Sequence, residues 1–126
     1  MQPEILLVDD DKIILDLGVL VLQEAGYGVT AVGSGDIALV ILEQDLRFRL
    51  LITDVVLPGL FDGFALARKA KTLVPDICII YTTGYGGGIV RVRSQGAPYG
   101  EVLAKPWKTS ELLKLTGFMI GLPSHA

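Results

Sequence analysis

A chain of 126 residues, 51% of them hydrophobic and 20% charged, suits one domain with a buried core and excludes wholesale disorder. No apolar run is long enough to cross a bilayer, and the net charge of −3 argues against nucleic acid or an anionic membrane as the main partner. The single cysteine, Cys78, excludes an intramolecular disulfide and a cysteine-based zinc site, and no signal-peptide pattern begins the chain, so we expect a cytoplasmic protein.

Short apolar runs alternate with amphipathic stretches along the chain. The runs predict strands at residues 5–8, 29–32, 50–53, 77–81 and 101–104. Helical spacing of apolar residues predicts helices over 12–25 and 62–71, and two more helices capped by Ser34 and Thr109. The glycine-rich segment 84–98 favours at most a short, displaced or mobile helix.

The apolar residues of the capped helices are expected to face the core. These inward-facing residues are Ile37, Ala38, Ile41, Leu42, Leu112, Leu113 and Phe118. Five strands that alternate with helices predict an α/β fold: a doubly wound, five-stranded parallel sheet with helices on both faces. We expect residues 1–126 to form a single domain.

Polar side chains follow four of the predicted strands. They are Asp9, Asp10 and Asp11 after the first, Asp54 after the third, Thr82 and Thr83 after the fourth, and Lys105 after the fifth. The carboxyl ends of parallel strands meet at one edge of the sheet, where such folds bind ligands. Clustered carboxylates require a cation, and oxygen ligands without histidine or thiolate favour Mg²⁺. A lysine and a hydroxyl beside them suit a phosphoryl group, which a carboxylate can accept.

Four segments in register resemble the receiver domain of response regulators in two-component signalling, with a likeness to the receivers of hybrid sensor kinases. These segments are residues 5–11, 51–58, 81–84 and 103–106. The resemblance implies a flavodoxin-like receiver fold in which Asp54 is the phosphoacceptor. It implies Mg²⁺ bound by Asp9, Asp10, Asp54 and the backbone carbonyl of Val56, and contacts from Thr83 and Lys105 to the phosphoryl group. It also implies a cis Lys105–Pro106 peptide, while Asp11 is interpreted as a helix cap.

The implied function is that of a phosphoacceptor domain in a phosphorelay, which receives a phosphoryl group from a sensor histidine kinase or a histidine phosphotransfer protein and switches conformation. Such a domain is not an enzyme beyond phosphorylating itself from phosphodonors and dephosphorylating itself. Direct binding to nucleic acid or membrane is not expected. The output partner, and whether the chain is a stand-alone regulator or part of a hybrid kinase, stay open.

Three features depart from the family pattern, and one of them is the loose segment 84–98, where the family carries its fourth helix. Phe61 adds a residue to the loop after Asp54, so this loop is expected to bulge near the site. Val102 stands where the family often has an aromatic residue that reorients on activation, so an aromatic switch requires Tyr99 or Trp107 as a substitute.

Two alternatives remain open from the residues. The aspartates at 9–11 also resemble the motif of haloacid-dehalogenase-type phosphohydrolases, with Asp9 as nucleophile and Asp11 as acid/base. Those enzymes usually need a longer chain, and Asp54 fits the receiver pattern instead. The second alternative is a pseudo-receiver that binds partners without phosphorylation, against which the complete acidic pair, Thr83 and Lys105 argue.

Overall fold

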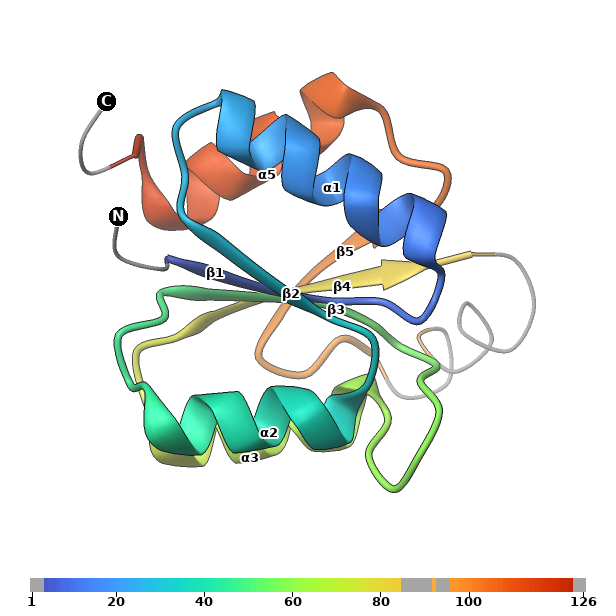
Figure 1. The fold of residues 1–126 in the computed structure, drawn as a ribbon, viewed down its shortest axis with the longest axis vertical. Coiled ribbons are helices and arrows are strands. Elements are labelled where there is room, and N and C mark those ends of the chain that lie inside the picture. The colour runs from blue at the N-terminus through green and yellow to red at the C-terminus, as the bar shows by residue number, and fades with distance from the viewer. Residues whose placement is uncertain (1–3, 85–91, 93–95, 124–126) are drawn as a thin grey trace.

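The computed structural model describes residues 4–84, 92 and 96–123, and shows a parallel sheet between two layers of helices (Figure 1). In chain order the elements are β1 (Ile5–Val8), α1 (Lys12–Glu24), β2 (Val29–Val32), α2 (Gly35–Gln44), β3 (Leu50–Asp54), α3 (Gly63–Leu73), β4 (Cys78–Thr83), β5 (Gly100–Ala104) and α5 (Thr109–Ile120). The strand order is β2-β1-β3-β4-β5, and every neighbouring pair is parallel. The predicted doubly wound fold is therefore confirmed.

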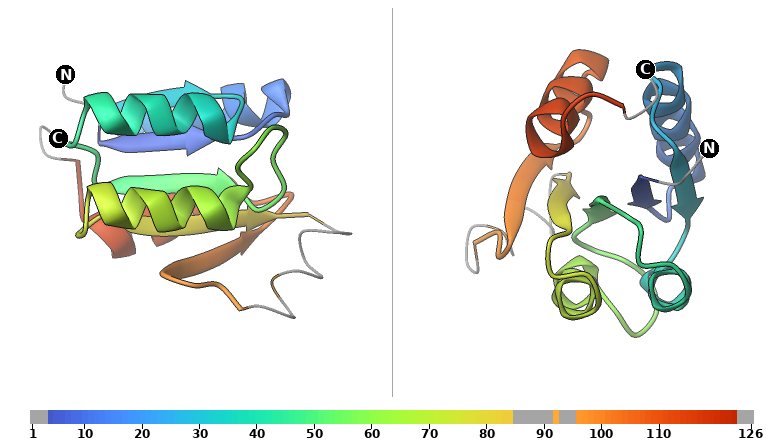
Figure 2. Two further views of the ribbon diagram at one scale, coloured as in Figure 1. Left: turned by 90° about the horizontal axis from the view of Figure 1, so that it is seen from below. Right: turned by 90° about the vertical axis from the view of Figure 1, so that its left-hand side faces the viewer.

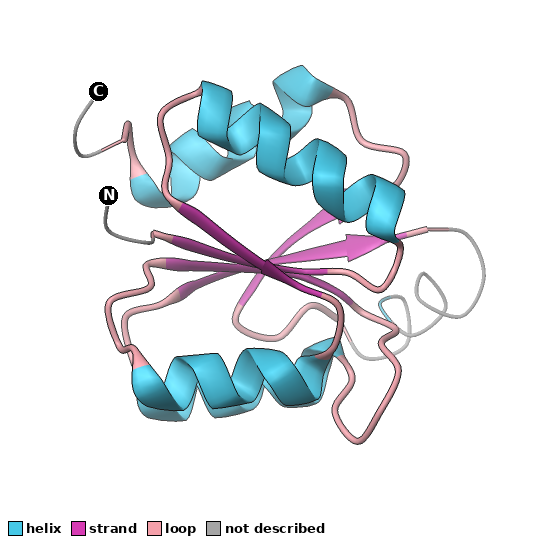
Figure 3. Ribbon diagram, in the orientation of Figure 1, coloured by secondary structure: helices cyan, strands magenta, loops and turns pink. Residues whose placement is uncertain are grey.

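The helices cover both faces of the sheet, with α1 and α5 on one face and α2 and α3 on the other (Figures 1 and 3). Two further views show the same three layers (Figure 2). Each face has its own apolar core, and every residue of β1 and β3 is buried. Burial on both faces explains why these strands are nearly continuous apolar runs rather than alternating ones.

Side-chain caps begin the first three helices. The Asp11 carboxylate accepts hydrogen bonds from the amides of the first turn of α1, as its interpretation as a cap requires. The Ser34 hydroxyl oxygen accepts from Ile37 N at 3.2 Å at the start of α2, and Asp62 accepts from Ala65 N at 2.8 Å at the start of α3. These bonds satisfy amides that have no partner inside the helix.

The predicted cap of the last helix is wrong by one residue. Lys108, with extended backbone, is the N-cap of α5, and Thr109 is already helical. The Glu111 carboxylate reaches back to accept a hydrogen bond from Lys108 N at 2.9 Å. Acidic residues in the first turn of a helix are favourable, and Glu111 satisfies the backbone amide of the N-cap residue rather than an amide of the first turn, which a threonine hydroxyl at the N-cap would have bound.

Two residues expected in the core are exposed. The buried face of α5 follows Leu112, Thr116 and Ile120, so Phe118 points away from it and is 79% exposed. In α2 the buried positions are Gly35, Ala38 and Leu42, which leaves Ile37 52% exposed in the first turn. Apolar periodicity overestimated the width of both buried faces, because one sheet face covers only a narrow stripe of each helix.

The strand limits also differ slightly from those predicted. β4 starts at Cys78 and continues through Thr83, and β5 starts at Gly100. The helix expected within 84–98 lies mostly outside the described residues. No helix in the described ranges is long and apolar enough to span a membrane.

Candidate functional site

The parallel sheet brings the expected polar residues to one edge. Asp9 follows β1 directly, and Asp54 is the last residue of the neighbouring β3, with Val8 and Thr53 paired in register beside them. Lys105 follows β5, and its backbone N–H bonds to Thr83 O at 2.7 Å, which ties it to the end of β4. Four strand ends thus converge, as their shared direction requires.

Lys105 connects two buried carboxylates. Its Nζ atom lies 2.8 Å from Asp54 Oδ2 and 3.0 Å from Asp9 Oδ2. Burial disfavours the charge on the lysine, but the hydrogen bonds from Lys105 to Asp54 and Asp9 outweigh burial and raise its pKa above the ordinary value. The ammonium group is therefore charged at neutral pH and lies between the two carboxylates.

Backbone amides hold the other oxygens of these carboxylates. Asp11 N donates to Asp9 Oδ1 at 2.9 Å, and Val56 N donates to Asp54 Oδ1 at 3.2 Å. Burial nevertheless raises the pKa of Asp9 above its ordinary value, since the bonds from Asp11 and Lys105 only partly oppose it and the Asp54 charge adds to it. Burial, more than repulsion from Asp54, therefore disfavours the charged form of Asp9.

Three carboxylates at this edge form a candidate metal centre. Oxygens of Asp9, Asp10 and Asp54 all lie within 4.8 Å of one another. Asp9 and Asp54 are buried, whereas Asp10 is exposed at the rim, so the cluster is open to solvent on the Asp10 side. Carboxylate oxygens are ligands for hard divalent cations, and a cation would offset the repulsion that Lys105 leaves. The donor set fits such an ion.

Thr83 is at the edge of the cluster rather than bonded to it. Its side chain is buried at the end of β4, and its hydroxyl donates to the neighbouring Gly84 O at 3.2 Å. Thr82 is the residue paired in register with Asp54. The Lys105–Pro106 peptide is cis, as the resemblance implied.

The loop after Asp54 packs against the start of α2. Leu60 N donates to Asp36 Oδ1 at 3.2 Å, and Phe61 lies so close to Gly35 that an added Cβ would be 3.1 Å from Phe61 Cβ. The ammonium of Lys69 lies 5.3 Å from the centre of the Phe61 ring. The extra residue is therefore accommodated toward α2, while Val56 at the beginning of the loop is 48% exposed beside the carboxylates.

Sequence reasoning missed two residues next to the site. Gly63 starts α3 directly against the acceptor strand: its N–H bonds to Val55 O at 2.9 Å, and an added Cβ would overlap the carbonyl oxygen of Asp54. Tyr81 lies in β4, two residues before Thr83, and its hydroxyl donates to Pro98 O at 2.7 Å. The Asp62-Gly63 pair in the sequence was a signal for the role of Gly63. Nothing in the sequence indicated the hydrogen bond from Tyr81 to Pro98.

The residues proposed as substitutes for an aromatic switch lie elsewhere. Tyr99 is 53% exposed in the turn before β5, and Trp107 packs half-buried against the core on the α1 side, near Gly18. Val102 is half-buried and pairs in register with Tyr81. The aromatic residue beside Val102 is therefore Tyr81 in β4.

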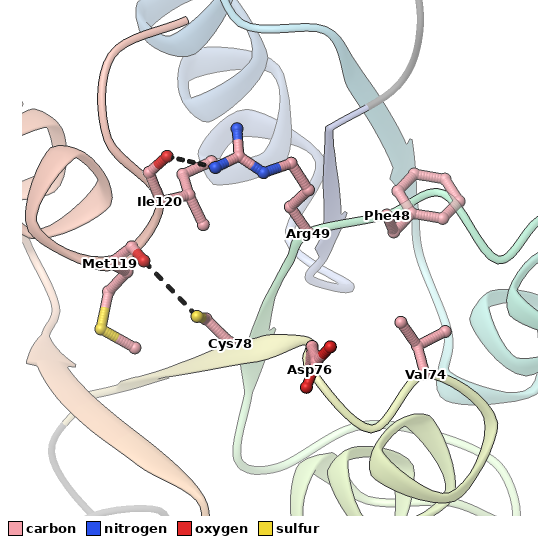
Figure 4. Close-up of a pocket in the computed structure, with 7 residues that line it drawn as sticks. All are labelled: Phe48, Arg49, Val74, Asp76, Cys78, Met119 and Ile120. Atoms are coloured by element: carbon pink, nitrogen blue, oxygen red, sulfur yellow. Dashed lines mark hydrogen bonds between the residues drawn. The ribbon is translucent and has the colours of Figure 1, made fainter. Parts of the chain in front are cut away.

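A pocket of about 290 Å³ opens at the amino ends of β3 and β4, beside the end of α5 (Figure 4). There Arg49 Nη2 donates to Ile120 O at 2.6 Å, and Cys78 Sγ lies 3.5 Å from Met119 O. Both bonds engage carbonyl groups at the end of α5, which have no partner within the helix. The side chains of Arg49 and Cys78 thus help to fix α5, and the pocket is at the opposite end of the sheet from the carboxylates.

Known proteins resemble this chain in sequence and fold. The family model described as the response regulator receiver domain matches residues 5–116. The response regulator receiver protein CpdR of Brucella abortus is 36% identical over 109 residues, which cover 86% of this chain and 89% of that protein. The sensor kinase CckA of the same organism is 34% identical over 86% of this chain, but only 11% of its own length is covered.

Solved structures agree with the sequence comparisons. The crystal structure of a response regulator receiver protein from Sinorhizobium medicae superposes with a TM-score of 0.83 at 31% identity, and the match covers 93% of each chain. The family model, the sequence relatives and the similar structures thus all match nearly the whole chain. The chain therefore belongs to the response regulator receiver domains, the phosphoacceptor modules of two-component signalling.

Proposed function

We propose that Asp54 is the residue that accepts the phosphoryl group, that a bound Mg²⁺ is required, and that residues 1–126 act as a single receiver domain. The observation that carries the proposal is the position of the Lys105 ammonium, within hydrogen-bond distance of both Asp54 and Asp9. Asp54 combines a carboxylate at the end of a central strand with a neighbouring cation and two further carboxylates. Asp9 shares these neighbours, but its side chain is only 4% exposed against 13% for Asp54, so Asp54 is the more accessible of the two carboxylates.

The residues of the site have distinct roles in this reaction. An oxygen of Asp54 attacks the phosphorus atom, the bond from phosphorus to the donor breaks, and the donor leaves with the electron pair. Lys105 moves its hydrogen bond from the carboxylate to a phosphoryl oxygen. The Thr83 hydroxyl, which now donates to Gly84 O, donates instead to another phosphoryl oxygen. Asp9, Asp10, Asp54 and the carbonyl of Val56 would hold Mg²⁺, which supplies positive charge for the phosphoryl oxygens.

The phosphodonor is proposed to be the phosphohistidine of a sensor histidine kinase or a histidine phosphotransfer protein in the cytoplasm. The relatives support this class of partner, because CckA is named a sensor kinase and CpdR a response regulator receiver protein. Apart from this transfer, the domain is proposed to phosphorylate itself from small phosphodonors and to lose the group by hydrolysis.

The alternatives lack support in the geometry. A phosphohydrolase would need Asp11 as a free acid/base, but its carboxylate caps α1. Its nucleophile would be Asp9, which is 3% exposed and therefore less accessible than Asp54, which is 9% exposed. A pseudo-receiver would not need the complete set of three carboxylates and a lysine at one edge.

Labelling with acetyl phosphate and Mg²⁺ tests the acceptor. We expect one acid-labile phosphoryl group per chain, and none in Asp54→Asn. Asp16→Asn is the matched control, because Asp16 is an exposed carboxylate that pairs only with Lys12 among the described residues. Undiminished labelling of Asp54→Asn would refute the assignment of the acceptor, and labelling that persists when Mg²⁺ is chelated would refute the requirement for the metal.

A further inference from the structure

Tyr81 is a buried tyrosine whose hydroxyl holds the turn that leads into β5. Its Oη atom donates a 2.7 Å hydrogen bond to Pro98 O, and its side chain has no solvent exposure. The ring meets Phe64 edge-on, with 5.0 Å between ring centroids. Burial raises the pKa of Tyr81 above its ordinary value, so the hydroxyl remains protonated and available as a donor at neutral pH.

The turn that receives this bond, residues 96–100, has an unfavourable backbone. Tyr99 has a φ of 72°, in the left-handed region that side chains with a Cβ rarely adopt. Gly100 lies so close to β4 that an added Cβ would overlap Ile79 O. Such a conformation persists only where its surroundings impose it, and the Tyr81 hydrogen bond is one of the contacts that do so.

Strand β5 therefore connects the acceptor site with this turn. At its carboxyl end, Lys105 bonds to Asp54 through its side chain and to Thr83 O through its backbone. At its amino end, the turn is bonded to Tyr81. Because side chains alternate along a strand, Tyr81 and Thr83 lie on the same face of β4, and Tyr81 pairs in register with Val102 at the middle of β5.

We propose that the Tyr81 hydroxyl couples the acceptor site to the turn of residues 96–100, through a hydrogen bond that is formed in the unphosphorylated protein and weakened in the phosphorylated one. The inference rests on the proposed function. A phosphoryl group at Asp54 draws Lys105 and Thr83 into new contacts at one end of the β4–β5 pair. A movement of β5 relative to β4 lengthens the bond from Tyr81 to Pro98 at the other end, and releases the left-handed Tyr99.

A bond made in only one of two states opposes the transition to the other. Removing it should therefore favour the phosphorylated state. We expect Tyr81→Phe, which keeps the ring and loses only the hydroxyl, to bind beryllofluoride with Mg²⁺ about two- to tenfold more tightly than the wild type in calorimetric titrations. Without beryllofluoride, the amide resonances of Tyr99 and Gly100 in this variant should already be displaced toward their positions in the liganded wild type.

Tyr27→Phe is the matched control. Tyr27 is also buried, and its hydroxyl donates to a carbonyl oxygen at the same distance, 2.7 Å, but the acceptor is Gly121 after the end of α5. We expect this variant to bind beryllofluoride as the wild type does. An equal gain in affinity in both variants would overturn the inference, as would an unchanged affinity of Tyr81→Phe with unmoved Tyr99 and Gly100 resonances.

A second measurement needs no substitution. Exchange of the Tyr81 hydroxyl proton with water in the wild type should be slow and should accelerate when beryllofluoride saturates the site. Unchanged exchange would overturn the inference. This test remains decisive even if Tyr81→Phe fails to fold. If the exchange is unchanged but the wild type still binds beryllofluoride and Asp54→Asn does not, the inference fails and the proposed function survives. A wild type that binds no beryllofluoride would overturn the proposed function and this inference with it.

Discussion

Replacing Gly63 with alanine should disturb the acceptor site through the backbone. An added Cβ would overlap Asp54 O, and it would lie 3.0 Å from both Asp54 C and Val55 Cα. All three atoms belong to the main chain of a buried strand end and have no rotamer by which to move away. The start of α3 must therefore recede, which also weakens the 2.9 Å bond from Gly63 N to Val55 O.

Overpacking costs about 1–3 kcal/mol and the weakened hydrogen bond up to about 1.5 kcal/mol, so we expect a loss of about 2–4 kcal/mol in unfolding free energy. For a domain of this size the melting temperature should fall by about 10 °C, measured by circular dichroism. The displaced Asp54 should also slow labelling by acetyl phosphate by about tenfold or more, because misplacement of a reacting group by about 1 Å is costly.

Gly117→Ala is the control for Gly63→Ala. Gly117 lies inside α5, and the nearest atom to an added Cβ is Tyr27 Oη at 4.0 Å. This variant should gain about 0.5–1 kcal/mol from the better helix propensity of alanine and should be labelled at the wild-type rate. The reasoning is refuted if Gly63→Ala melts and is labelled like the wild type.

Four further outcomes are expected. Mg²⁺ should raise the melting temperature of the wild type by mass action, and Asp10→Ala should remove most of that rise; a melting curve independent of Mg²⁺ contradicts the metal centre. Because burial raises the folded-state pKa of Asp9 above 3.8, the stabilisation from its protonation is complete below that value and is lost as pH rises through the folded pKa. In metal-free urea unfolding, Asp9→Asn should therefore be more stable than the wild type at pH 7, with a difference that shrinks toward pH 4; a difference that does not change with pH would argue against this origin. Lys105→Ala should still be phosphorylated, but the amide shifts that beryllofluoride causes at residues 96–105 should be reduced, and full shifts would show that the lysine is not required for coupling. Since the Val56 side chain is half exposed at the site and cannot orient water, Val56→Asn should shorten the lifetime of the phosphorylated protein, measured by loss of radiolabelled phosphate; an unchanged lifetime would assign control to another group.

Local patterns in the sequence were sufficient for the fold and for most of the site. Apolar runs at β1 and β3 are typical of strands buried on both faces, and alternation with helices requires parallel strands joined by right-handed crossovers. Parallel strands place their carboxyl ends at one edge, so Asp9, Asp54 and Lys105 could be assigned to one site without a structure. The caps at Asp11 and Ser34 were equally predictable, because they depend on neighbouring residues alone.

Only the tertiary structure decided which contacts the site residues make and which helix faces are covered. Phe118 has the spacing of a core residue but is exposed, since what a helix buries depends on the sheet packed beneath it. The role of Gly63 follows from the approach of α3 to Asp54, and the bond from Tyr81 to Pro98 joins residues from a strand and a distant turn. Sequence patterns report the periodicity of one segment, whereas these contacts arise between segments whose separation is set by packing of the whole domain.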